Sequence, residues 1–252
     1  MSINSSIGEE AVKVTLINYT QNAVELLLFT KATRLTMSPG LLDEIKAKSE
    51  EDKLAELEYM ANTVPSSWEF VDYVFLVEGV SRAYTHQQVR TRTGSYAQQA
   101  MRILDVGDFD YIYTDRNDAQ PIAKAIIDDA MAAVKGAYRE LIDIGQLPED
   151  ARGVLPTNIS TNIVCKFNLR AFADLVDKRA GGRTQSEYQR VVGAMIDEVL
   201  KVHPWAEKFL FQRGRDFFAE IEAFAQREFG NDLKKKGDLL KIVDLMKKRG
   251  GQ

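Results

Sequence analysis

The chain has 252 residues, enough for one sizeable domain or for one domain with an appended segment, and its 45% hydrophobic and 28% charged residues are ordinary for a soluble globular protein. Its formal net charge of -4 gives no reason to expect nucleic acid or an anionic membrane as a partner. The N-terminus has no basic and apolar leader, and the single cysteine cannot form an intrachain disulfide, so we expect a cytoplasmic protein.

Hydrophobic periodicity predicts strands and helices that alternate loosely along the chain. Apolar and polar residues alternate, as in strands, at 12–16, 71–77 and 159–167. Helices are expected at 22–34, 41–62, 80–92, 121–144, 149–154, 169–178, 185–202 and from Trp205 onward. The order lacks a regular βαβ rhythm, so we predict an α+β fold with a mixed or antiparallel sheet flanked by long helices.

Local signals refine these boundaries. Gly79 is expected to end the second strand, and 93–95 to form a turn. Ser66 and Glu69 have the spacing of a helix capping box. The apolar stripe of the 121–144 helix is expected to consist of Ile122, Ile126, Ala130, Val134, Ala137 and Leu141.

Three separated segments contain candidate arginines, and in the first of them four arginines have no acidic neighbour. The first runs from 81 to 102, the second from 148 to 156, and the third from 168 to 187. Clustered guanidinium groups repel one another unless an anion lies between them, and their planar fork matches phosphate oxygens. The three segments therefore predict one site that binds a polyanion. The alternative is a solvated basic surface whose arginines pair with distant carboxylates.

Other signatures of chemistry are missing from the sequence. Two histidines, His86 and His203, are too few for a typical histidine-based metal site, so no metal is predicted. There is no GxGxxG, P-loop or GxSxG motif. Cys165 lies in an apolar strand and is interpreted as a small buried hydrophobe. Because no protein nucleophile stands out, we expect a bound cofactor to supply the chemistry.

The ordered set of segments resembles the flavin-dependent thymidylate synthases. That family carries Arg-His-Arg, seven residues and then Ser, followed by Pro-Glu-x-Ala-Arg-x-x-Leu-Pro, Asn-x-Arg, and an Arg before Gln-x-Glu. The matching residues here are Arg90-Thr91-Arg92 with Ala100, the intact segment 148–156, Asn168-Leu169-Arg170, and Arg179 before Gln185-Ser186-Glu187. The resemblance predicts a domain of this kind at 1–212 and a helical C-terminal extension at 213–252.

The resemblance implies an α+β fold and a homotetramer with active sites between subunits. It implies FAD as cofactor and a uracil nucleotide as substrate, with methylenetetrahydrofolate and NADPH as co-substrates. Arg90 and Arg179 match catalytic positions. The nucleotide positions are Gln87, Arg90, Ala100, Met101, Arg102, Arg152 and Arg179. The flavin positions are Ser66, Arg90, Thr91, Arg92, Gln98, Asn168, Arg170, Asp174 and Arg183.

Several of these positions depart from the family. Thr91 replaces the signature His, Ala100 the signature Ser, Gln98 a carboxylate and Arg183 a late His. The departures suggest a specialised relative that methylates UMP, dUMP or both at C5, since relatives acting on UMP occur in nucleoside-antibiotic pathways such as that of polyoxin. The alternatives are a pyrimidine nucleotide hydroxymethylase and a flavin- or nucleotide-binding paralogue without catalysis.

Overall fold

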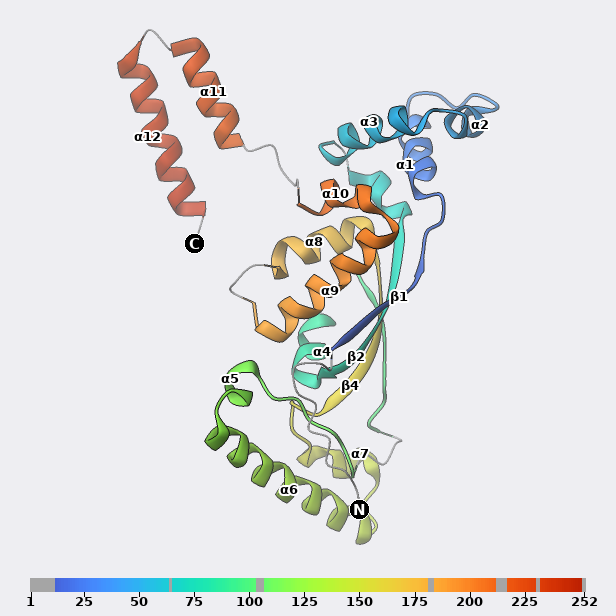
Figure 1. Ribbon diagram of the computed structural model, residues 1–252, viewed down its shortest axis with the longest axis vertical. Coiled ribbons are helices and arrows are strands. Elements are labelled where there is room, and N and C mark those ends of the chain that lie inside the picture. Colours follow the sequence, from blue (N-terminus) through green and yellow to red (C-terminus); the bar gives the residue numbers. More distant parts are fainter. Residues whose placement is uncertain are drawn as a thin grey trace.

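The computed structural model describes residues 12–63, 65–102, 107–180, 184–211, 217–229 and 232–250. Its sheet has four antiparallel strands in the order β1-β2-β4-β3 (Figure 1). The strands are β1 (Lys13–Tyr19), β2 (Asp72–Ser81), β3 (Ser95–Gln98) and β4 (Ser160–Asn168). The α+β class is confirmed, and the sheet is antiparallel rather than mixed. The short edge strand β3 was not predicted.

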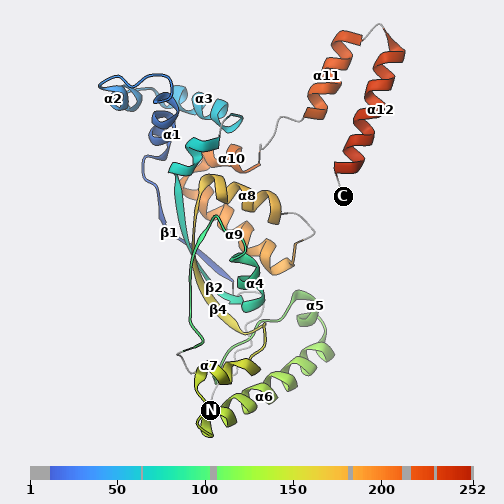
Figure 2. The same cartoon turned by 180° about the vertical axis from the view of Figure 1, so that it is seen from behind.

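Helices cover one face of this sheet. They are α4 (Arg82–Gln88), α8 (Leu169–Arg179), α9 (Ser186–Val202) and α10 (Glu207–Phe211), preceded by the short η3 (Pro204–Ala206) (Figures 1 and 2). Alternate residues of the two central strands point into the core beneath them. Tyr73, Phe75, Val77, Ile163, Cys165 and Phe167 are each at most 1% exposed. Side chains of Val, Leu, Ile or Phe size contribute about 1.5 to 3 kcal/mol each when buried, so this layer holds the site elements in place.

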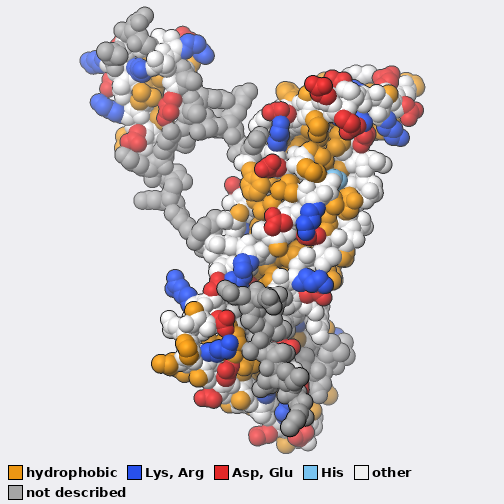
Figure 3. Space-filling view, in the orientation of Figure 1, with side chains coloured by type: hydrophobic (Ala, Val, Ile, Leu, Met, Phe, Trp, Pro, Cys, Tyr) orange, Lys and Arg blue, Asp and Glu red, His pale blue; other side chains and the backbone are white. Residues whose placement is uncertain are grey.

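The two ends of the sheet are covered by different segments. At one end lie α1 (Ala23–Ala32), α2 (Leu41–Lys46), α3 (Glu50–Ala61) and the 3-10 helix η1 (Pro65–Phe70). At the other end lie α5 (Asp115–Asp118), α6 (Pro121–Asp143), α7 (Pro148–Ala151) and η2 (Arg152–Val154). Figure 3 shows acidic side chains gathered over the α2–α3 end.

Four boundaries differ from the sequence prediction. Gly79 does not end β2: it adopts φ 67°, and the register with β4 shifts between Val77 and Val80, so the strand continues through a bulge. The helix expected at 41–62 is broken, because Ser49 caps a new helix by accepting from the Asp52 N–H. The helix expected at 80–92 is only α4. Ser66 lies inside η1 and caps no α-helix.

The long helix α6 has two apolar sides. Met131 and Tyr138 are buried in the chain. Within the predicted stripe, Ile122 is 79% exposed and Ile126 is 64% exposed, whereas Val134 packs against the buried cluster that contains Met131. Exposed apolar side chains one helical turn apart form a surface that another protein surface can cover.

The C-terminal segment forms a helical pair. Helices α11 (Phe217–Phe229) and α12 (Leu233–Gly250) pack on each other, with Ala225 and Val243 buried. Figures 1 and 2 both show this pair standing apart from the sheet and its helices. The helical character predicted for this extension is confirmed over these ranges, while the domain boundary stays a prediction. None of the helices described has an apolar stretch sufficient to traverse a bilayer.

His203 makes the stability of this fold depend on pH. Its ring lies 3.0 Å from the Tyr73 hydroxyl, and burial lowers the pKa of His203 from 6.5 to about 4. Between these two pH values the His203 ring is protonated in the unfolded chain and neutral in the folded chain. The free energy of unfolding therefore decreases as the pH falls from 6.5 toward 4. We expect this loss to be about 3 kcal/mol. Urea titrations at several pH values should show it in the wild type and not in His203→Phe; equal pH slopes would contradict it.

Candidate active site

The third arginine-rich segment holds the first in place at the start of α4. The carboxylate of Glu187, which is 5% exposed, accepts from the Ser81 backbone N–H at 2.7 Å and from the Ser81 hydroxyl at 2.6 Å. Ser81 in turn caps α4 by accepting from the Tyr84 N–H. The Gln87 amide donates to the Gln185 side-chain oxygen at 2.7 Å. Gln185 and Glu187 therefore set the position of α4.

Arg179 lies beside this junction. Its guanidinium carbon is 5.0 Å from the centre of the Tyr188 ring, which orients the charge by a cation–π contact. Tyr188 meets Tyr84 of α4 edge to face at 5.0 Å. The structure thus brings Arg179 and Gln87 to the same junction of α4, α8 and α9, as two of the predicted nucleotide residues. Arg90, which follows α4 and was predicted to contact both ligands, is exposed.

The remaining predicted nucleotide residues lie at the other end of α4. A cavity of about 240 Å³ opens there, lined by Arg82, Gln99, Met101, Asp108, Phe109, Ile159, Ser160 and Thr161. The Arg82 guanidinium donates to the Gln99 carbonyl at 2.6 Å, so it holds the segment that leads into Ala100, Met101 and Arg102. Arg152 lies near enough for its charge, together with burial, to lower the pKa of Arg82.

Several predicted flavin residues gather at the opposite end of β4. Asn168 ends this strand and caps α8, because its side-chain oxygen accepts from the Ala171 N–H. Arg170 pairs with Glu69 of η1 at 2.6 Å, and Ser66 of the same 3-10 helix accepts from Arg34. Asp174 lies one turn after Arg170 on the same side of α8. Arg183 lies outside the described residues.

Thr91 and Arg92 reach this end through the short edge strand. Ser95 of β3 pairs with Lys166 of β4, so the residues before Ser95 run toward the end of β4. The Tyr96 hydroxyl donates to the backbone oxygen of Thr91 at 2.7 Å. Because this bond uses the backbone, it holds the segment whatever side chain occupies the signature His position.

Gln98 is tied to α4 rather than open to a ligand. Its amide donates to the Thr85 hydroxyl at 2.7 Å, and that hydroxyl donates to the Arg82 carbonyl at 3.1 Å. A carboxylate at position 98 could only accept, and the proton of Thr85 is already used. The amide is therefore suited to this buried contact, which accounts for Gln98 where the family has a carboxylate.

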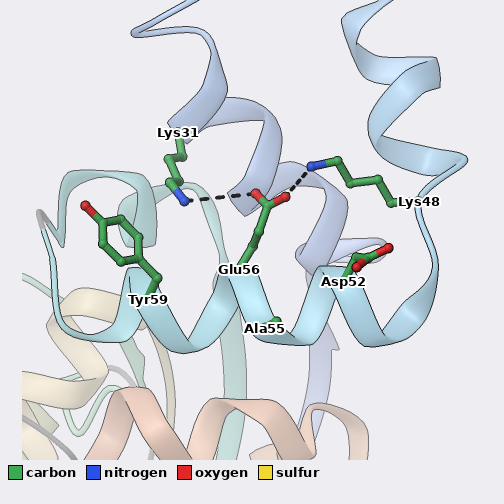
Figure 4. A pocket seen from close by; sticks show the side chains of 6 residues that line it. All are labelled: Lys31, Lys48, Asp52, Ala55, Glu56 and Tyr59. Atoms are coloured by element: carbon green, nitrogen blue, oxygen red, sulfur yellow. Dashed lines mark hydrogen bonds and ion pairs between the residues drawn. The ribbon is translucent and has the colours of Figure 1, made fainter.

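A second and larger hollow lies on the surface of α3. It measures about 560 Å³ and is lined by Lys31, Lys48, Asp52, Ala55, Glu56 and Tyr59 (Figure 4). Glu56 bridges the two lysines, and the Lys31 amine sits 4.5 Å from the centre of the Tyr59 ring. Both lysines of this hollow are thus paired with a carboxylate of the chain. Across the described residues, no three metal-ligating side chains of His, Cys, Asp or Glu come together.

Sequence patterns missed three residues that shape the site. Glu187 was identified only as part of a motif, and its bonds to Ser81 have no local signal because 106 positions separate the two residues. Arg82 was counted among the clustered arginines without a role. A Ser directly before a helix is a capping signal, so the function of Ser81 at α4 could have been found from the sequence.

A family comparison covers most of the chain. Residues 15–205 match the family model described as thymidylate synthase complementing protein, and the chain belongs to that family.

Curated relatives of this chain are flavin-dependent thymidylate synthases. The flavin-dependent thymidylate synthase of Clostridium tetani is 30% identical over 211 residues, covering 77% of this chain and 84% of the relative. That of Geobacter sulfurreducens is 32% identical over 197 residues, with the same shares of 77% and 84%. That of Sulfurisphaera tokodaii is 31% identical over 196 residues, covering 77% and 75%. The match confirms the resemblance found in the motifs.

Proposed function

We propose that this chain is a flavin-dependent enzyme that methylates C5 of a uracil nucleotide monophosphate, dUMP, UMP or both. Methylenetetrahydrofolate donates the carbon, and FAD reduced by NADPH is the hydride source. The observation that supports this most strongly is the placement of separate arginine-rich segments around α4, in the order that the family uses. Arg82 lies at one end of this helix, within electrostatic reach of Arg152, and Arg179 lies at the other end.

In this proposal the nucleotide is held by Gln87, Arg90, Arg102, Arg152 and Arg179, with the backbone at Ala100 and Met101. Guanidinium groups bind a dianionic phosphate by charge-assisted hydrogen bonds, which are about twice as strong as neutral ones. Arg179 is fixed by its stacking on Tyr188, so little side-chain freedom is lost on binding. Arg90 and Arg179 are proposed as the catalytic residues because they would contact the reacting ligands.

The residues at the end of β4 fit a flavin by their chemistry. Arg170 and Arg92 offer cationic donors for phosphate oxygens, and Asn168 and Ser66 offer neutral polar groups. Reduced flavin supplies the hydride when it is bound. The part of this chain is to orient the flavin against the uracil and to hold the phosphate groups of both ligands.

A homotetramer with active sites between subunits is part of the proposal. Within one chain β3 separates Arg92, on the flavin side, from Met101, on the nucleotide side, and its four residues span about 10 Å. Residues that must serve one reaction thus lie at two ends of an edge strand, which favours completion of the site by another copy. The exposed stripe of Ile122 and Ile126 on α6 supplies an apolar surface for such a contact.

The single cysteine is expected to be dispensable. Cys165 is buried in β4, and burial raises the pKa of its thiol from 9.0 to about 12, so almost no thiolate forms at neutral pH. We expect Cys165→Ala to keep turnover within about twofold of wild type, at a small loss of stability from the missing sulfur. The rate of product formation measures this, and complete loss of activity in a folded, flavin-loaded variant would point to a cysteine nucleophile.

Arg179→Ala should weaken nucleotide binding strongly. One lost charge-assisted contact costs on the order of 2 kcal/mol, which is about 30-fold in the dissociation constant. Calorimetric titration of the FAD-loaded variant with dUMP and with UMP measures the change. The matched control is Arg190→Ala, because Arg190 lies on α9 and pairs with Asp115 on the surface. Unchanged affinity in Arg179→Ala would remove this residue from the site.

The function itself is tested by turnover. Purified protein is incubated with NADPH, methylenetetrahydrofolate and either dUMP or UMP, and the product is analysed by mass. Gain of a methyl group supports the proposal, and comparison of the two rates assigns the preferred sugar. A product heavier by one oxygen would indicate the hydroxymethylase instead. Yellow protein that binds nucleotide but oxidises no NADPH would indicate a paralogue without catalysis.

A further inference from the structure

The cavity at the start of α4 contains a positive charge that no motif assigns. Arg82 is the first residue of α4, and its backbone N–H is bonded to the Ile159 carbonyl at 3.0 Å, which fixes the residue against the start of β4. Its guanidinium donates to the Gln99 carbonyl at 2.6 Å. The Nε atom of the same group is buried and has no hydrogen-bond partner among the described residues.

A second polar atom at the same cavity, the hydroxyl oxygen of Thr161, is also buried without a hydrogen-bond partner among the described residues. Thr161 itself is 4% exposed. Both Arg82 and Thr161 line the cavity, and both can donate a hydrogen bond. A buried polar group left unpaired costs about 1 to 3 kcal/mol, so two such groups in one cavity indicate that a ligand completes it.

The charges around the cavity select an anion. Within the described residues, Arg82 and Arg152 have no ion pair with a carboxylate, and the side-chain bond of Arg152 goes to the Glu149 backbone oxygen at 3.1 Å. Among the described residues that line the cavity, the one acid is Asp108, whose carboxylate is 3.2 Å from Arg139 and 3.9 Å from Lys135 of α6. The two site arginines therefore keep an excess of positive charge.

The size of the cavity selects the part of the ligand. Its volume of about 240 Å³ is below the ~300 to 1,000 Å³ of sites that enclose a whole small molecule. It suits a phosphate group with part of its sugar. Met101 lines the same cavity next to Ala100, where the family's signature Ser is missing.

We propose that Arg82 is a phosphate-binding residue of the nucleotide site, which supplies charge where Ala100 has lost a hydroxyl and fixes the Gln99–Arg102 segment through the Gln99 carbonyl. This inference rests on the proposed function, because it assigns the 5′-phosphate of the nucleotide to the cavity. It adds Arg82 to the nucleotide-binding arginines and gives the loss of the signature Ser a physical compensation.

The test compares ligands with and without phosphate on three variants of the FAD-loaded protein. Arg82→Gln should weaken dUMP binding by about 10- to 100-fold and leave the affinity for deoxyuridine unchanged. Arg82→Lys keeps the charge but loses the guanidinium fork, so we expect an intermediate loss. Arg190→Gln removes an arginine of α9 that pairs with Asp115 on the surface, away from this cavity, and should change neither affinity. Melting temperature and FAD content report whether each variant folds.

The outcomes separate this inference from the proposed function. If Arg82→Gln binds dUMP like wild type, or loses dUMP and deoxyuridine equally, the phosphate role is wrong. If wild type binds neither dUMP nor UMP, the proposed function fails, and inorganic phosphate then probes the cavity alone. Phosphate binding by wild type that is lost in Arg82→Gln would still support an anion site, whereas no phosphate binding by wild type would overturn it.

Discussion

Glu187→Ala should destabilise the protein by about 3 to 4 kcal/mol and at the same time displace α4. The buried carboxylate accepts two hydrogen bonds from Ser81, at 2.7 and 2.6 Å, and a bond to a charged group contributes about 1.5 to 3 kcal/mol. Without it, the Ser81 N–H and hydroxyl would be buried unpaired. Because Ser81 caps α4, Arg82 and Gln87 would lose their position as well. The free energy of unfolding measured in urea and the affinity for dUMP should therefore both fall.

Two variants show whether the carboxylate is responsible. Glu187→Gln keeps the shape and one acceptor oxygen, so this variant should lose only about half of the stability that Glu187→Ala loses. Asp197→Ala removes an exposed carboxylate from the same helix and should change stability by less than about 0.5 kcal/mol. If Glu187→Ala and Asp197→Ala were equally stable, the buried contact would have no structural weight.

Periodicity predicted the elements in which one side of the chain is buried. The alternation in β2 and β4, and the 3.6-residue spacing in α1, α8 and α9, are visible because Phe75, Phe172 and Val192 must all face one core. It failed where another force sets the structure. β3 has only four residues, too few for a clear alternation, and is held by its pairing with β4. Glycine at 79 permits the positive φ of a bulge as readily as the end of a strand.

The apolar stripe predicted on α6 is buried only in part within the chain. Ile122 and Ile126 have the spacing of a core stripe, yet the chain buries Met131 and Tyr138 on another side. Apolar periodicity marks every helix face that is buried from water. It does not distinguish a face buried in the core of one chain from a face that a second copy can cover. For the same reason, the oligomeric state does not follow from the periodicity of the sequence.

The candidate site was predicted in its residue types better than in its contacts. Motif order proposed Arg90, Arg152 and Arg179 as ligand residues, because the planar guanidinium fork matches phosphate oxygens. It did not reveal that Asn168 also caps α8, or that Gln98 serves a buried bond to Thr85. These contacts join residues that lie apart in the sequence, and they show that several ligand-site candidates also stabilise the scaffold.

Gly94→Ala should cost about 3 kcal/mol and reduce FAD uptake, because the site segment 90–92 depends on close packing at this residue. A Cβ atom at Gly94 would overlap the buried ring of Phe167 and lie 2.6 Å from the Tyr96 hydroxyl oxygen. Phe167 is 1% exposed and cannot move away, while displacing Tyr96 would break its bond to the Thr91 backbone. Gly136→Ala is the matched control, since nothing lies within 4 Å of its added Cβ, and in a helix it should gain about 1 kcal/mol. Denaturation curves and flavin absorbance measure both variants, and wild-type stability with full flavin in Gly94→Ala would show that the segment does not need this packing.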